Sequence, residues 1–323
     1  MRDFLCPKCG QRLAFENSQC LNCGSELGFD PATRDFALVG GPLSRCLNHV
    51  LAECNWLVGS PDSLCRSCAL TRTRPSDGDL VALPEFAQAE GAKRRLVVEL
   101  DELGLPIVGR GDDPDNGLCF DLLSSERSSV TTGHDSGVIT LDLAESDDVH
   151  REQLRTSMDE PYRTLLGHFR HEVGHYYFEV LVAGTAAESE FESLFGDPNA
   201  DYQAALQRHY SNGAPAGWPG SYISAYATMH PAEDWAETFA HYLHIRDTVD
   251  TAAAFGLAPA GATLDRPLAG DAGFDRLIDL WLPLSWSLNM INRSMGHPDL
   301  YPFVLPTAAL AKMRFIHRLV GEA

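Results

Sequence analysis

The chain has 323 residues, 44% of them hydrophobic, which is enough for one substantial domain and a small one. Its formal net charge of −20 argues against a nucleic-acid binder, because so acidic a chain would repel phosphate. No apolar run approaches the roughly 20 residues that a membrane span needs. A cysteine pattern begins at residue 6, which leaves no room for a signal peptide. We therefore expect a cytoplasmic protein with neither a nucleic-acid nor a membrane partner.

Eight of the nine cysteines lie within the first 68 residues, in two sets of four. Both halves of the first set have C-x₂-C spacing, and the last pair of the second set has it too. Four thiolates in such pairs are typical of a closed, tetrahedral, structural zinc site. Clustered pairs without a secretion signal argue against disulfides. We therefore predict two structural zinc ions, one held by Cys6, Cys9, Cys20 and Cys23 and one by Cys46, Cys54, Cys65 and Cys68.

Two details of these sets carry further expectations. Gly10 and Gly24 follow the second cysteine of each pair in the first set, where a tight turn requires a positive φ. In the second set, His49 is an alternative to Cys54 as a ligand, because Cys46 and His49 also have the spacing of a zinc-binding pair.

The turn-rich segment 73–79 predicts a linker between a zinc-ribbon region, residues 1–75, and a larger domain, residues 80–323. The first region carries eight Lys and Arg against seven Asp and Glu, and its thiolates add negative charge when zinc is bound. It therefore lacks the basic surface of a nucleic-acid binder and is instead a candidate surface for a protein partner.

The first part of the larger domain is predicted to combine a helix with strands. Residues 80–104 read as the helix. Cys119 is isolated, and we expect a buried apolar residue there rather than a nucleophile. The strands are predicted at residues 106–108, 118–123 and 137–143, the last of which alternates apolar with polar or small residues.

The run His171-Glu172-Val173-Gly174-His175 has the H-E-x-x-H pattern of zinc sites. Apolar residues recur around it at helical spacing, which places it in the middle of a helix within a mainly helical segment, residues 150–183. Residues four apart share a helix face, so the two imidazoles converge as zinc requires. Glu172 adjoins that site and could accept the proton of a water molecule. The alternative is a buried structural pair of histidines.

A second helix is predicted to begin at Pro231, with acidic residues in its first turn. Glu233 lies 58 residues after His175, and Glu237 follows four residues later on the same face. These two offer a third metal ligand and a carboxylate that orients an imidazole, and their spacing alone allows either assignment. The alternative is a solvated acidic face, and we expect Asp234 to face solvent or a backbone donor.

The segments around and after this helix are predicted as a loop, 211–220, and two helices, 274–292 and 307–320.

H-E-x-x-H followed by a helix with E-x-x-x-E resembles the gluzincin metallopeptidases, the thermolysin-like clan. The resemblance implies that Glu233 is the third zinc ligand and that Glu237 holds the first ligand histidine by a hydrogen bond. The segment E-D-W-A-E-T-F also resembles the corresponding part of anthrax lethal factor, which implies that Tyr226 assists catalysis, with Tyr222 as the alternative phenol. The clan resemblance further implies that residues 138–143 form an edge strand that pairs with extended substrate.

More closely, the chain is similar to a family of bacterial zinc-binding metallopeptidases that join an N-terminal zinc ribbon to such a domain. This similarity implies an α+β fold in which zinc-ribbon modules precede a mainly helical, zincin-like domain with a small sheet. It also favours Cys54 over His49, because Cys54 opens a family-like run. The similarity rests on C-N-W-L-V (54–58), L-L-G-H-F-R-H-E-V-G-H-Y-Y (165–177), F-G-D (195–197), I-S-A-Y-A (223–227) and H-P-A-E-D-W-A-E-T-F-A-H-Y-L-H (230–244).

The function that these resemblances imply is hydrolysis of peptide bonds in peptides or proteins. His171, His175 and Glu233 would hold one catalytic zinc ion, beside the two structural ones. Glu172 would act as general base, and Tyr226 would donate to the developing oxyanion. Two alternatives stay open: a zinc-stabilised binding or scaffold protein, and a zinc hydrolase of a non-peptide amide.

Overall fold

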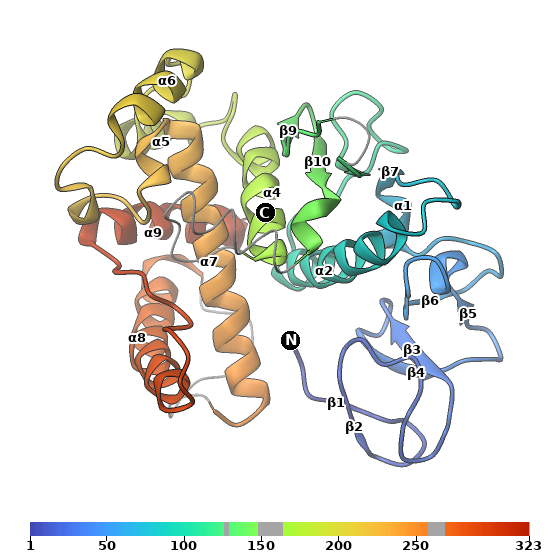
Figure 1. Cartoon of the computed structure of the whole chain (residues 1–323). Coiled ribbons are helices and arrows are strands. Elements are labelled where there is room, and N and C mark those ends of the chain that lie inside the picture. The colour runs from blue at the N-terminus through green and yellow to red at the C-terminus, as the bar shows by residue number, and fades with distance from the viewer. Residues whose placement is uncertain (126–128, 148–163, 258–268, 323) are drawn as a thin grey trace. The chain divides into compact units, whose positions relative to one another are not determined.

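In a computed structural model of the chain, we describe residues 1–125, 129–147, 164–257 and 269–322. The chain divides into two compact units, each described below by itself (Figure 1). One comprises Met1–Glu102 and Ile107–Leu166, and the other comprises Leu103–Pro106 and Gly167–Ala323. The domain bounds drawn from the sequence, 1–75 and 80–323, stay a prediction.

The N-terminal part of the first unit is built from three short antiparallel strand pairs and two turn-like helices. The pairs are β1 (Phe4–Leu5) with β2 (Arg12–Leu13), β3 (Leu27–Asp30) with β4 (Asp35–Leu38), and β5 (Ser44–Arg45) with β6 (Leu57–Val58); the helices are η1 (Leu47–His49) and α1 (Arg66–Ala69). Aromatic rings fill the small core between them, and Phe29 is central, with the ring centroids of Phe15 and Trp56 each 5.2 Å away.

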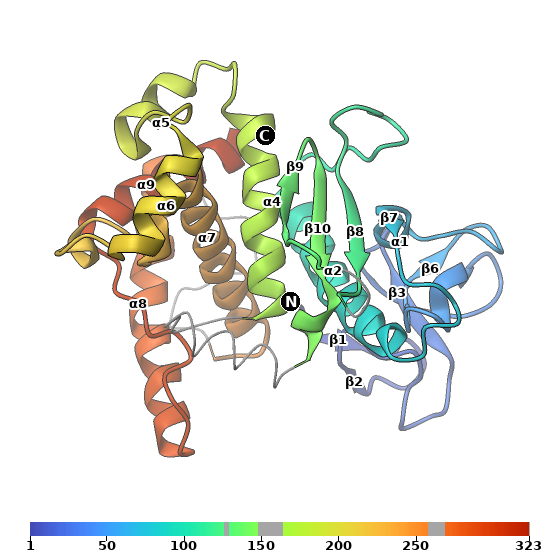
Figure 2. The same cartoon turned by 45° about the horizontal axis from the view of Figure 1, so that its top comes forward.

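The rest of the first unit is a four-stranded mixed sheet with a long helix along one face. The strand order is β7 (Thr71–Thr73), β8 (Cys119–Leu123), β10 (Val138–Asp142), β9 (Gly133–Asp135). The first three strands are parallel, and β9 runs antiparallel to β10. The helix α2 (Ala82–Leu103) covers one face of the sheet (Figure 2). Lys93 of this helix lies over the Phe120 ring of β8, with its Nζ 5.3 Å from the ring centroid. A short helix, η2 (Leu143–Ser146), follows β10.

These elements confirm the helix predicted at 80–104 and the strands predicted at 118–123 and 137–143. Cys119 is buried, as expected. The strand predicted at 106–108 is wrong: this stretch is irregular, and its one backbone bond to a strand neighbour runs from the Leu118 N–H to the Val108 carbonyl. Pro106 has no N–H group with which to extend a ladder.

The prediction of an edge strand at 138–143 is also wrong, because β9 covers β10 from Val138 to Thr140. The cause is a two-residue hairpin turn at Ser136 and Gly137. Both have positive φ, 48° and 79°, which is the type I′ geometry that suits the twist of two antiparallel strands. A side chain at 137 is also excluded, since its Cβ would lie 2.2 Å from the Asn116 carbonyl oxygen. The turn folds β9 back onto β10 and occupies that edge.

The second unit is helical. Its elements are α4 (Leu165–Leu181, which begins in the first unit), α5 (Glu188–Phe195), α6 (Tyr202–Asn212), η3 (Trp218–Gly220), η4 (Tyr226–Thr228), α7 (Pro231–Ala254), α8 (Gly270–Ser294) and α9 (Thr307–Glu322). Figure 1 shows α7 as the long helix in light orange, and it packs against α5, η4, α8 and α9. Trp235 and Phe239 of α7 are fully buried in this core. Among the described helices, none is long and apolar enough to cross a membrane.

The helices predicted at 274–292 and 307–320 are confirmed as α8 and α9. The motif helix is confirmed over 165–181, and the expected helical residues 150–163 lie outside the described part of the chain. The predicted loop at 211–220 is confirmed apart from the last residues of α6 and the short η3. Zinc-ribbon-like strand pairs, a small sheet and a mainly helical remainder together make the fold α+β, as predicted.

Candidate metal centres

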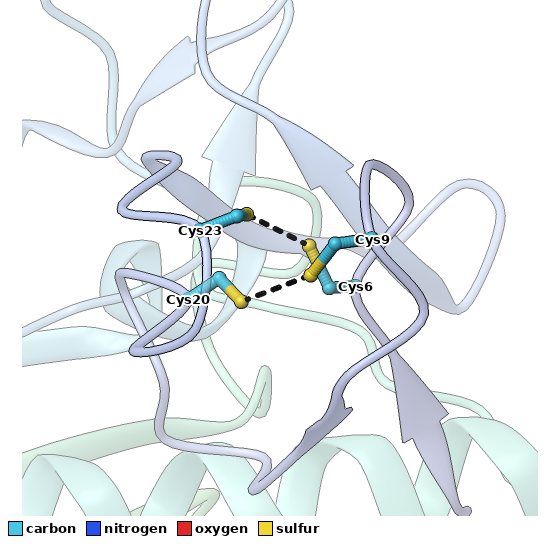
Figure 3. Close-up of side chains that lie close together, drawn as sticks. All are labelled: Cys6, Cys9, Cys20 and Cys23. Carbon is cyan, nitrogen blue, oxygen red and sulfur yellow. Dashed lines mark hydrogen bonds between the residues drawn. The ribbon is translucent and has the colours of Figure 1, made fainter.

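The first cysteine set converges on one point, as Figure 3 shows. The sulfur atoms of Cys6 and Cys23 are 3.8 Å apart, and those of Cys9 and Cys20 are 3.6 Å apart. Four thiolates about 2.3 Å from a tetrahedral zinc ion lie about 3.8 Å from one another, whereas a disulfide would require about 2.05 Å. The donor set therefore fits zinc and excludes disulfide pairing.

Two tight turns position the four sulfur atoms around this point. The N–H of Gly10 donates to the Cys6 carbonyl at 2.9 Å, and the N–H of Gly24 donates to the Cys20 carbonyl at 2.8 Å. Both glycines have positive φ, 72° and 68°, which confirms the expectation from their places in the sequence. Ser25, next along the chain, lowers the pKa of Cys23 to about 6 through its hydroxyl and its backbone N–H, which favours the thiolate.

The second cysteine set also converges, and all four of its side chains are buried. The sulfur atoms of Cys54 and Cys65 are 3.7 Å apart, and the Cys65 N–H donates to the Cys46 sulfur at 3.2 Å. His49 lies elsewhere: its Nδ1 is 3.1 Å from the Cys46 carbonyl oxygen. The structure therefore groups Cys54, rather than His49, with the other three cysteines, in an arrangement that also fits zinc.

Charged residues of α2 surround this second set, and the sequence analysis missed them. Glu90 reaches the Cys68 sulfur at 3.7 Å and forms a fully buried ion pair with Lys93 at 2.6 Å. Arg94 donates to the carbonyl oxygens of Ala52 at 3.1 Å and Glu53 at 3.3 Å, just before Cys54. Four thiolates and Zn²⁺ leave a net charge of about −2. Lys93 balances Glu90, so Arg94 is the cation that offsets part of this buried negative charge.

The third candidate centre depends on the close approach of α4 and α7. A Cβ atom on Gly174, inside the H-E-x-x-H run, would lie 3.1 Å from the Ala236 Cα and 3.4 Å from the Phe239 Cβ. Glycine therefore lets the two backbones come almost into contact. The Trp235 indole N–H donates to the Gly174 carbonyl oxygen at 2.7 Å and fixes the register of the two helices.

This packing brings together His171 and His175 from α4 and Glu233 from α7, with donor atoms within 4.8 Å of one another. The His171 Nε2 is 3.1 Å from one Glu233 oxygen, and the His175 Nε2 is 3.7 Å from the other. Ligands about 2.0–2.2 Å from a tetrahedral zinc ion are about 3.3–3.6 Å apart. Two imidazoles and a carboxylate at this spacing fit a zinc ion that keeps one position open.

Glu237 lies behind the first histidine. Its Oε1 is 2.8 Å from the His171 Nδ1, and its Oε2 accepts a hydrogen bond from the Ser224 hydroxyl at 2.6 Å. Burial alone would raise the pKa of Glu237, but the bond to His171 outweighs it and lowers the pKa to about 2. A carboxylate that accepts from Nδ1–H leaves Nε2 free to face a metal. The sequence analysis gave Ser224 no role, although it lies in the family-like run 223–227.

The other polar groups near this centre are a carboxylate and two phenols. Glu172 is 8% exposed, and its carboxylate makes no hydrogen bond to another described residue. The Tyr226 ring lies 6.1 Å from the His171 ring, between centroids, and burial raises the pKa of Tyr226. Tyr202 of α6 donates to a Glu233 oxygen at 2.9 Å, a contact that sequence reasoning missed. Tyr222 instead stacks against Lys312, whose Nζ is 4.3 Å from the ring centroid.

The expectation that Asp234 faces solvent or a backbone donor is wrong. Asp234 is 1% exposed and forms an ion pair with Lys312 of α9 at 2.5 Å. Burial raises the pKa of Asp234 to about 6 even though the lysine opposes that shift. His230 caps α7, since its Nδ1 accepts from the Ala232 N–H at 3.1 Å. The first turn of α7 is therefore held on both sides of Glu233.

Comparisons with known proteins match two consecutive parts of the chain. A family model described as "putative zinc-binding metallo-peptidase" matches residues 82–319, and a zinc-ribbon model matches residues 3–79. Proteins of Mycobacterium tuberculosis and Mycobacterium bovis, both named as uncharacterized, are each 65% identical to the chain over 327 residues. These alignments cover 100% of this chain and 96% of each relative. No solved structure matches the chain.

Proposed function

Because the chain belongs to the family of zinc-binding metallo-peptidases that matches residues 82–319, we propose that it hydrolyses peptide bonds in peptides or proteins. The observation that carries the proposal is the convergence of His171, His175 and Glu233, with Glu237 on the outer nitrogen of His171. Three protein ligands with one imidazole held by a carboxylate are the arrangement of a catalytic rather than a structural zinc site.

The residues present suit three zinc ions. Two would be closed and structural, one in each cysteine set, and the third would lie between His171, His175 and Glu233. Zinc at the third centre would acidify a water molecule and polarise the carbonyl of the bond to be cleaved. Glu237 keeps the Nδ1 proton of His171 in place, so that the lone pair of Nε2 faces the centre.

Glu172 is the general base in this proposal. It directly follows the proposed ligand His171 on α4, and its carboxylate makes no hydrogen bond to another described residue. It would take the proton of the attacking water and return it to the leaving amine. Tyr226, whose ring neighbours His171, would donate its phenol hydrogen to the carbonyl oxygen as negative charge develops there.

The proposal is tested with the full chain and a matched variant, Glu172→Gln. Both proteins are loaded with zinc, shown by elemental analysis to hold equal amounts, and incubated with a peptide library derived from a bacterial proteome. We expect new peptide termini with the wild type and at least about 100-fold fewer with the variant, the scale of a lost general base. Equal cleavage by both proteins, or none by fully loaded wild type, would contradict the proposal.

A further inference from the structure

Tyr202 links the start of α6 to the Glu233 carboxylate. Its hydroxyl donates to Glu233 Oε1 at 2.9 Å, while Glu233 Oε2 lies 3.1 Å from the His171 Nε2. The Glu233 side chain is 4% exposed, so its charge has little contact with water. A hydrogen bond to a buried carboxylate is stronger than one between neutral groups and holds it in one orientation.

The position of Tyr202 is itself fixed by His230. The His230 ring packs on the Tyr202 ring, with centroids 5.2 Å apart. The His230 Nε2–H donates to the Ala200 carbonyl oxygen at 2.9 Å, just before α6, while Nδ1 accepts from the Ala232 N–H in the first turn of α7. One buried imidazole thus joins the segment that carries Tyr202 to the turn that carries Glu233.

We propose that Tyr202 is a positioning residue of the third centre, whose hydroxyl fixes the Glu233 carboxylate against the two histidines so that the centre is preorganised for zinc. The inference rests on the proposed function in one respect, the assignment of Glu233 as a zinc ligand. Without the hydroxyl, Oε1 loses a charge-assisted bond, and the carboxylate must be ordered by the metal alone. Partners of this kind behind a ligand are typically worth about 10- to 100-fold in metal affinity.

The test compares Tyr202→Phe with Tyr210→Phe in the full chain. Tyr210 lies on the same helix, is 70% exposed, and undergoes the same loss of one oxygen atom. The third centre is emptied by a mild chelator and refilled with Zn²⁺ or Co²⁺ under chelator competition. We expect the zinc affinity of Tyr202→Phe to fall about 10- to 100-fold and its cobalt absorption spectrum to change, because the spectrum reports the ligand field. The Tyr210→Phe variant should match the wild type in both.

A double-mutant cycle with Glu233→Ala, which removes the acceptor of the Tyr202 hydroxyl, separates this role from a general structural one. If Tyr202 acts through Glu233, Tyr202→Phe should have little further effect on zinc affinity in the Glu233→Ala background. An undiminished effect there, or equal affinities for Tyr202→Phe and Tyr210→Phe, would overturn the inference. A wild type that binds zinc at the third centre but cleaves no peptide would refute the proposed function, and the affinity comparison would still decide the role of Tyr202.

Discussion

The cysteine sets and the His171–His175–Glu233 centre assemble their donors in different ways. Each cysteine set draws four thiolates from turns within one short stretch, 6–23 or 46–68. The third centre draws three donors from two long helices, and its geometry depends on how α4 packs on α7 at Gly174. A site made of turns has little to hold it when its metal leaves, whereas a site on packed helices keeps its scaffold. The difference suits the proposed roles, structural for the cysteine sets and catalytic for the third centre.

The largest expected effect is the loss of one cysteine ligand. Cys65→Ser should release zinc from the second set and unfold the region around it, since structural zinc contributes about 10–16 kcal/mol of apparent binding free energy. Hydrogen exchange over residues 43–75 would measure the unfolding. Cys119→Ser is the matched control, because Cys119 is also buried but lies in β8 and in no cysteine set. Unchanged protection in Cys65→Ser would show that this region does not depend on metal.

A smaller effect separates the two glutamates of α7. Glu233→Gln should bind the third zinc ion far more weakly, because it weakens one of three bonds to the metal. Glu237→Gln should keep the zinc with an affinity or activity about 10- to 100-fold lower, since it disturbs only the partner of His171. Zinc retention against a graded series of chelators would rank the two. A reversed order would exchange their roles.

Gly174→Ala tests the scaffold of the third centre directly. A methyl group there meets the Ala236 backbone at 3.1 Å, so we expect a net loss of about 1–2 kcal/mol in unfolding free energy, with weaker zinc binding. The control is Gly91→Ala in α2, where the nearest neighbour of a Cβ outside the backbone of that helix is the end of the Arg94 side chain at 3.7 Å. There alanine should stabilise by up to about 1 kcal/mol. Urea unfolding of both variants measures this contrast, and equal shifts would argue against the close approach.

The smallest expected effect is at His49. Its ring faces the Cys46 carbonyl rather than the sulfur atoms, so His49→Ala should leave the zinc content of the second set unchanged. Elemental analysis of the purified variant would check this. A loss of one zinc ion per chain would mean that His49, not Cys54, completes the set.

The cysteine sets and the third centre also differ in how much of each could be predicted from the sequence. The cysteine sets were predictable because their spacing and following glycines are local features, and Gly10 and Gly24 have the φ that the pattern requires. The helices that carry the third centre were predictable from apolar periodicity. The role of Glu237 was assigned only through family resemblance, since its spacing from Glu233 allows either glutamate to be the metal ligand.

What could not be predicted depends on packing between distant segments. Tyr202 and Glu233 are 31 residues apart, and Asp234 and Lys312 are 78 apart. No periodicity within one helix reveals which residue of another helix it will meet. The edge strand was placed wrongly for a more local reason, because the hairpin turn at Ser136 and Gly137 was not recognised as one.

The central claim is that one chain holds closed structural sites and an open catalytic one, and selective metal removal tests it most directly. The full chain is treated with a mild chelator while zinc content, far-ultraviolet circular dichroism and peptide hydrolysis are followed together. We predict that one zinc ion per chain leaves, two remain, the helical signal is unchanged, and hydrolysis is lost and then restored by one equivalent of Zn²⁺. Collapse of the helical signal as the first zinc leaves, or hydrolysis that persists without it, would contradict the account.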